Sequence, residues 1–166
     1  MFRSTIIASV LAAVAMADCG FPNGTDTKLN WWQGQGTGNV KFTQYPIQLT
    51  KPLNIKLHFN NAQSVFNKPN LRLAISLYQY GGWSGCSWSE VPTFGLLNDL
   101  NACEENFPCP VELGEHDITA KLDFTKFNNI VSLLKDDAPY QIQLKLTDTV
   151  SKTYLILNAQ ARTRTK

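Results

Sequence analysis

The sequence has little net charge and few charged residues. Of its 166 residues, 15 are Lys or Arg and 13 are Asp or Glu, so that charged residues make up 17% of the chain. Nucleic-acid-binding domains carry a basic excess on one face, so this balance excludes a nucleic-acid partner. The basic residues Arg162, Arg164 and Lys166 cluster near the carboxyl terminus. We interpret this cluster as a solvated strand end rather than as a binding patch for a polyanion.

Long apolar runs are absent after the first residues of the chain. The run Ile6–Met16 is preceded by a single charge, Arg3, and Ala15-Met16-Ala17 has the A-x-A form of a signal-peptide cleavage site. We therefore expect residues 1–17 to be a secretory signal peptide and residues 18–166 to be one domain. Neither this run nor a later one reaches the ~20 apolar residues that a membrane span needs.

Catalytic and metal-binding motifs are also missing. The chain has no G-x-S-x-G, H-E-x-x-H, P-loop or G-x-G-x-x-G motif. Its two histidines, His58 and His116, are interpreted as surface residues. The acidic pairs Glu104-Glu105 and Asp136-Asp137 are interpreted as solvated rather than as calcium ligands. We therefore expect no enzyme activity, no cofactor and no metal.

Cysteine is scarce, but its distribution is informative. The four cysteines, Cys19, Cys86, Cys103 and Cys109, lack the C-x₂₋₄-C spacing of a zinc site. An even number of cysteines behind a signal peptide predicts two disulfides, for which three pairings are possible. Asn23-Gly24-Thr25 is an N-glycosylation sequon and predicts an exposed site.

What the sequence does contain is a repeated alternation of apolar and polar residues. This period of two predicts half-buried β-strands. The clearest strands span residues 53–59, 71–78, 118–124 and 140–146, and weaker ones span 30–32, 40–49 (broken near Pro46) and 153–161. Six or seven such strands with no long helix predict an all-β antiparallel sandwich.

Two short segments depart from this alternation. Between Phe127 and Leu134 the apolar residues follow the i, i+3, i+4, i+7 spacing of about two helical turns, and between Val91 and Leu100 they recur every three residues. We therefore expect one or two short helical segments. A helix this short is marginal in water and must dock on an apolar surface.

An aromatic cluster surrounds the second cysteine. Tyr78, Tyr80, Trp83 and Trp88 lie close to Cys86 in the sequence. Three interpretations remain open: a corner of the core beside a disulfide, the amphipathic rim of a pocket, or a platform for stacking sugars. Tyr and Trp suit a rim because each has an apolar ring and a polar group.

The segment Cys103-Glu-Glu-Asn-Phe-Pro-Cys109-Pro110 resembles the ML (MD-2-related lipid-recognition) domain family, nearest the GM2 activator and the Niemann-Pick type C2-like proteins. An early Cys19, the Leu96–Leu100 segment and the Tyr140-Gln-Ile-Gln-Leu144 strand add to the likeness. The resemblance covers the mature chain in outline and residues 86–161 in detail.

The resemblance implies an immunoglobulin-like antiparallel β-sandwich with a lipid cavity between its two sheets. It also implies a Cys103–Cys109 disulfide. Family members usually join the early Cys to one in the last strand, but here that strand, Tyr154–Asn158, has none. Cys19 is therefore left to pair with Cys86.

The function implied is that of a secreted or lysosomal lipid-binding and transfer protein. Its ligand would be a fatty acyl lipid, a glycolipid or a sterol, and the protein would be a monomer that serves a lysosomal hydrolase, a receptor or a membrane surface. The alternative is a secreted interaction domain with a filled core that binds a receptor or glycan through its loops.

The inward strand faces supply the expected cavity wall, which comprises Leu53, Ile55, Leu57, Phe59, Leu73, Ile75, Leu77, Leu122, Ile142, Leu144 and Leu146. The two irregular segments supply the expected mouth, which comprises Trp88, Phe94 and Leu97 on one side and Phe124, Phe127, Ile130, Val131 and Leu134 on the other. The family likeness implies that the second segment lies by the ligand entrance.

Overall fold

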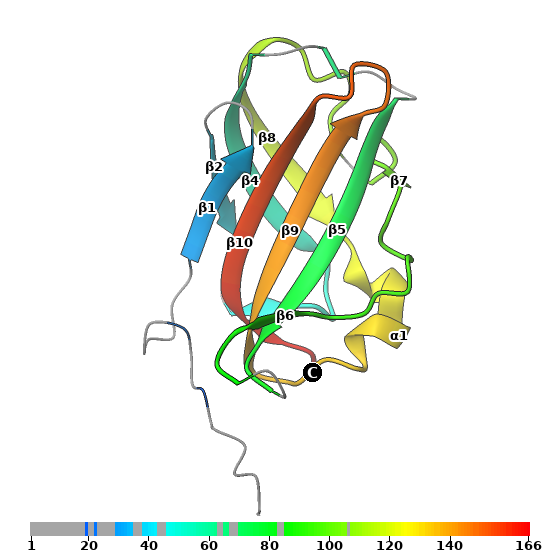
Figure 1. The fold of residues 1–166 in the computed structure, drawn as a ribbon. Coiled ribbons are helices and arrows are strands. Elements are labelled where there is room, and N and C mark those ends of the chain that lie inside the picture. Colours follow the sequence, from blue (N-terminus) through cyan, green and yellow to red (C-terminus); the bar gives the residue numbers. More distant parts are fainter. Residues whose placement is uncertain are drawn as a thin grey trace, which may run out of the picture.

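The computed structural model describes residues 19, 22, 29–34, 38–42, 46–62, 65–66, 70–82, 85–105 and 107–166. The predicted signal peptide (residues 1–17), the sequon at Asn23 and the aromatic Trp83 lie outside these residues. The described part of the chain is an all-β sandwich of two sheets with one short irregular helical segment (Figure 1). This confirms the predicted fold class.

The larger sheet contains seven strands. Its order is β1 (Leu29–Gly34), β10 (Tyr154–Arg164), β9 (Ala138–Asp148), β5 (Leu71–Tyr80) and β6 (Trp88–Glu90), with β3 (Ile47–Gln48) beside β10 and β7 (Leu100–Asn101) beside β5. The pairings of the larger sheet are antiparallel apart from the short one between β3 and β10, which is parallel. The chain here leaves the smaller sheet, follows the end of β10 for two residues and returns.

The smaller sheet contains β2 (Gly38–Phe42), β4 (Leu53–Asn61) and β8 (Gly114–Leu122), in that order. The two sheets face one another (Figure 1). All eleven residues of the expected cavity wall point inward and are at most 4% exposed. The alternation that predicted these strands is therefore the alternation between the interior and solvent.

One edge of the sandwich is not closed by strand pairing. Among the described residues, β8 pairs only with β4, while β6 and β7 pair only with β5. A single bridge between Phe66 and Val111 joins the sheets ahead of β5 and β8. At the other end of this edge, η2 (Phe124–Phe127) and α1 (Asn128–Val131) lead the chain from β8 to β9 (Figure 1).

The predicted two-turn helix between Phe127 and Leu134 is shorter than expected. It is one 3₁₀ turn followed by one α-helical turn. The 3₁₀ turn begins at Asp123, whose carboxylate accepts the backbone N–H of Thr125 at 3.0 Å. Ile130, Val131 and Leu134 are buried while Phe127 is half-buried, so the predicted apolar face docks on the sandwich.

The second predicted helical segment, between Val91 and Leu100, is not a helix. Phe94, Gly95 and Asp99 have φ values of 52°, 78° and 57°, whereas an α-helix requires a negative φ. Val91 and Leu97 are buried in the core and Leu100 packs against it, but Phe94 is 78% exposed. The three-residue spacing here reflects turns rather than a helical face.

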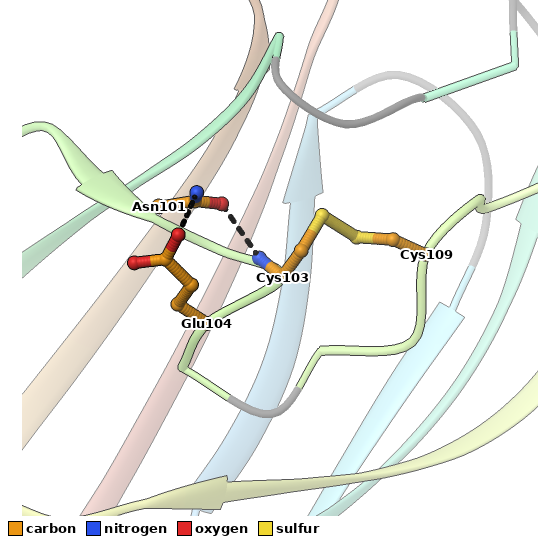
Figure 2. Close-up of a disulfide and its surroundings, with 4 residues drawn as sticks. All are labelled: Asn101, Cys103, Glu104 and Cys109. Atoms are coloured by element: carbon orange, nitrogen blue, oxygen red, sulfur yellow. Dashed lines mark hydrogen bonds between the residues drawn. A yellow bond between two sulfur atoms is a disulfide. The ribbon is translucent and has the colours of Figure 1, made fainter.

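Both expected disulfides are present in the structure, Cys19–Cys86 and Cys103–Cys109. Figure 2 shows the smaller bridge beside Asn101, whose side-chain oxygen accepts the Cys103 N–H at 3.2 Å. The Asn101 amide also donates to Glu104 at 2.7 Å. These contacts fix the turn that leads from the larger sheet towards β8.

Candidate functional site

A groove of about 640 Å³ lies at the open edge of the sandwich. It separates the β5–β6 hairpin from the residues that follow α1. Its lining comprises Gln79, Gly81, Gly82, Ser89, Glu90, Val91, Pro92, Leu133, Leu134 and Lys135. The groove therefore lies between the two segments from which the sequence predicts a pocket mouth.

The inward faces of the strands change from apolar to polar as they reach this groove. On β5 the buried Leu77 is followed, two residues on, by Gln79, and on β9 Ile142 is preceded by Tyr140. Gln79 pairs in register with Tyr140 and with Ser89 of β6. Side chains two apart in a strand share a face. Gln79, Ser89 and Tyr140 therefore lie on the inward face of the larger sheet, and on β5 and β9 they stand next to the last apolar residues towards the groove.

Tyr140 connects the two walls of the groove. Its hydroxyl lies 3.1 Å from the backbone carbonyl of Lys135 and 3.3 Å from the side-chain oxygen of Gln79, and it donates to these acceptors. The residue is only 2% exposed. Burial raises the pKa of Tyr140 to about 12, so the hydroxyl keeps its proton at physiological pH.

The floor of the groove is apolar. Val91 and Leu134 both line it and both belong to the hydrophobic core of the sandwich. Leu133, beside them, is 63% exposed. A molecule in this groove would thus contact core side chains below and polar side chains around it.

Asp136 and Asp137, which follow Lys135, are bound by residues at the carboxyl end of β10 and just beyond it. The Arg162 guanidinium donates to Asp137 at 2.7 Å and lowers the pKa of that carboxyl below its usual value. The Thr165 N–H donates to Asp136 at 2.7 Å and lowers its pKa likewise. Arg164 also approaches Asp137, at 3.7 Å. Part of the predicted cationic cluster is therefore engaged in ion pairs rather than only solvated.

The eight predicted mouth residues are placed differently from one another. Leu134 alone lines the groove. Leu97, Phe124, Ile130 and Val131 are buried, Phe127 is half-buried and Phe94 is exposed. Trp88 packs against Tyr80, with ring centroids 5.2 Å apart, on the face of the hairpin opposite Gln79 and Ser89.

Four polar groove residues, Gln79, Ser89, Glu90 and Lys135, were not among the residues selected from the sequence. Gln79 could have been found, because it is the next residue on the inward face of β5 after Leu71, Leu73, Ile75 and Leu77, and it is the first polar one. Glu90 and Lys135 carry no such signal. Their approach depends on how the chain between β8 and β9 folds back beside β6.

The histidines lie away from the groove. His58 on β4 contacts two carboxylates of β8, with Nδ1 2.9 Å from Asp117 and Nε2 3.5 Å from Glu115. Within the described residues, no group of three or more His, Cys, Asp or Glu side chains could hold a metal ion. His116 stacks on Phe59 at 5.4 Å.

The acidic pair Glu104-Glu105 is not a joint site either. Glu104 accepts the amide of Asn101, whereas Glu105 pairs with Lys126 at 3.3 Å. The two carboxylates therefore have separate partners.

Neither a protein-family model nor a curated protein matches this chain. The resemblance to the ML domain family accordingly stays a prediction based on the residues quoted for it. No helix in the described part of the chain is long and apolar enough to cross a membrane.

Proposed function

We propose that the protein binds a lipid between its two sheets and transfers it between membranes. The observation that carries this proposal is the groove at the open edge of the sandwich, whose floor residues Val91 and Leu134 belong to the core. A groove in this position gives an acyl chain a route towards the apolar strand faces. No covalent step is required.

The sheet arrangement supports the proposal because no strand pairing closes this edge within the described residues. The backbone bonds of the Phe66–Val111 bridge join the sheets at the far end of this edge, so separation at the groove end would leave them intact. Among the described residues, the segments beside the groove are residues 91–99 and the short η2–α1 segment. Short segments of this kind open more readily than the long strands of the sheets.

The energy of binding would come from burial of the acyl chain. Each buried CH₂ contributes about 0.8 kcal/mol, so a chain of about 16 carbons contributes roughly 10 kcal/mol before the cost of ordering it. Such contacts depend on shape and length. The polar residues Gln79, Ser89 and Tyr140 at the groove end of the interior would then determine which end of the lipid faces outward.

Exposed apolar side chains near the groove support contact with a membrane. Leu133 lines the groove, and Phe94 and Leu96 follow its Val91-Pro92 wall at 78% and 50% exposure. Large exposed apolar side chains grouped on one part of a surface mark interaction sites. We propose that these three residues insert into the bilayer interface while the lipid is exchanged.

The proposed site of action is extracellular or lysosomal. Two disulfides are compatible with an oxidising compartment. The proposed signal peptide would direct the chain there.

A binding titration tests the proposal. The purified mature protein is stripped of lipid and titrated with fluorescent fatty acid, sterol and glycolipid probes, while an organic extract of the untreated protein is analysed by mass spectrometry. We expect saturable binding of at least one probe and one co-purified lipid. A close-packed protein that yields no lipid and binds none of the probes would instead support the loop-mediated interaction domain.

A further inference from the structure

Within the described residues, β8 is an edge strand of the smaller sheet (Figure 1). It pairs with β4 along all nine of its residues, from Gly114 to Leu122. Among the residues that the structure describes, no other strand pairs with β8, and no further backbone hydrogen bond joins residues 114–122 to another part of the chain. A row of backbone N–H and C=O groups therefore points away from β4, and such a row is a template for pairing with another strand.

The inward face of β8 is incompletely covered at the middle of the strand. Ala120 and Leu122 are buried, but His116 and Ile118 on the same face are only half-buried. Ile118 packs against the core without being enclosed by it. A further strand alongside β8 would cover the exposed part of Ile118, and burial of this apolar surface would favour pairing.

The outward face of β8 carries its charges in a self-complementary order. Along the strand it presents Glu115, Asp117, Thr119 and Lys121. If two copies of β8 pair antiparallel about a two-fold axis at Ile118, Glu115 of each copy lies opposite Lys121 of the other. Asp117 then lies opposite Thr119, and no like charges face each other directly. Opposite charges in directly facing positions stabilise a strand pair.

The order of the charges also selects one register among the neighbouring ones. A pairing centred on Asp117 would place the two Asp117 carboxylates opposite each other, and one centred on Thr119 would place Glu115 opposite Asp123. Like charges in directly facing positions destabilise a strand pair. A shift by a single residue would place inward side chains opposite outward ones. The register centred on Ile118 avoids both problems and pairs the whole strand.

We propose that the outer edge of β8 is an interaction surface for a second copy of this chain, so that the smaller sheets of two copies join into one continuous sheet. Charged side chains on an edge strand usually prevent such pairing, whereas the charges of β8 favour it in this register. The contact does not use the groove, since no residue of β8 lines the groove. The inference is independent of the proposed lipid binding and replaces the monomer that the family resemblance implied.

Sedimentation equilibrium of the mature protein, over a wide range of concentrations, measures the self-association. The test variants are Glu115→Lys and Lys121→Glu, each of which would place like charges opposite each other at two symmetric positions. Their matched controls are Glu90→Lys and Lys145→Glu, which make the same charge changes on strands of the larger sheet. All four side chains are exposed, and urea unfolding checks that every variant is folded.

The wild type and both controls should dimerise with the same Kd. Each test variant alone should dimerise about tenfold more weakly, because the symmetry of the dimer repeats every repulsive pair. An equimolar mixture of the two test variants should dimerise like the wild type. The reason is that a heterodimer places a lysine opposite a glutamate at both positions.

Three results would overturn the inference. The first is a wild type that stays monomeric at every concentration. The second is a dimer whose Kd the test variants do not change, since the contact would then lie on another surface. The third is a mixture of folded test variants that does not recover the dimer, which would exclude the antiparallel pairing centred on Ile118. None of these results bears on lipid binding, which the probe titration tests separately.

Discussion

The hydroxyl of Tyr140 donates a hydrogen bond to the backbone carbonyl of Lys135, 3.1 Å away, and so ties β9 to the wall of the groove. The same hydroxyl lies 3.3 Å from the Gln79 side chain on β5. One buried group therefore links the larger sheet to the segment that carries Leu134 and Lys135. Its removal should affect the position of that wall more than the sheet itself.

The variant Tyr140→Phe should be less stable by about 0.5–1.5 kcal/mol, because the Lys135 carbonyl and the Gln79 amide lose a donor while the ring remains packed. Urea unfolding at pH 7 measures this. The control is Tyr154→Phe, whose exposed ring lies 5.1 Å from the Lys145 ammonium, and which should change stability little. Equal losses in both variants would mean that the Tyr140 hydroxyl contributes nothing specific.

The raised pKa of Tyr140 predicts a dependence of stability on alkaline pH. An unfolded tyrosine loses its proton near pH 10, whereas burial raises the pKa of Tyr140 to about 12. Between these values the unfolded chain releases a proton that the folded protein retains, so stability falls as the pH rises from about 10 to 12. Below pH 10 the contribution is complete.

Phenylalanine at position 140 cannot titrate. The stability difference between the wild type and Tyr140→Phe should therefore narrow from pH 9 to pH 12, as measured by urea unfolding at each pH. A difference that stays constant over this range would contradict the pKa assignment.

The variants Ile142→Ala and Leu144→Ala distinguish a cavity wall from a filled core. A filled core loses about 2–5 kcal/mol on such a truncation. We expect the free energy of unfolding to fall by less than this and the lipid affinity to decrease clearly. The reason is that a bound acyl chain, rather than neighbouring side chains, would supply part of the contact. Val111→Ala, at the Phe66–Val111 bridge, is the control and should reduce stability without changing affinity.

Phe94→Asn should slow lipid transfer between vesicles without weakening the binding of a soluble lipid probe. Asn tolerates the positive φ of 52° at this position, and the exposed ring makes few contacts, so folding should be unaffected. Val150→Ser alters an exposed side chain in the β9–β10 turn, at the opposite end of the molecule from α1 (Figure 1). This control should transfer lipid at the wild-type rate.

Hydrogen exchange of residues 127–134 should be faster in the lipid-free protein than in the loaded protein. The backbone bonds from Ser132, Leu133 and Leu134 to the preceding turn belong to a segment too short to be stable alone. A bound acyl chain would supply contacts that it otherwise lacks. Strong and equal protection in both states would show that the segment is a fixed cap.

The strands could be predicted from the sequence because the alternation of apolar and polar residues depends only on residues that are neighbours in the chain. The alternation in residues 53–59 and 140–146 follows directly from one buried and one solvated face, and it located β4 and β9 to within a few residues. The spacing between Val91 and Leu100 was misleading for the opposite reason. Turns with positive φ at Phe94 and Asp99 place apolar residues at regular intervals without forming a helix.

The groove could not be predicted from the sequence, because residues far apart in the chain form it. Gln79 and Tyr140 are 61 residues apart, and only the pairing of β5 with β9 brings them together at the end of the interior. Glu90 and Lys135 both line the groove because β6 ends beside the residues that follow α1. Which strand faces are apolar can be predicted from the sequence, since this depends on each residue and its neighbours. Where those faces end, and which polar residues border them, follows from the folded structure, because strand register and the path of the chain between the sheets are set by long-range packing.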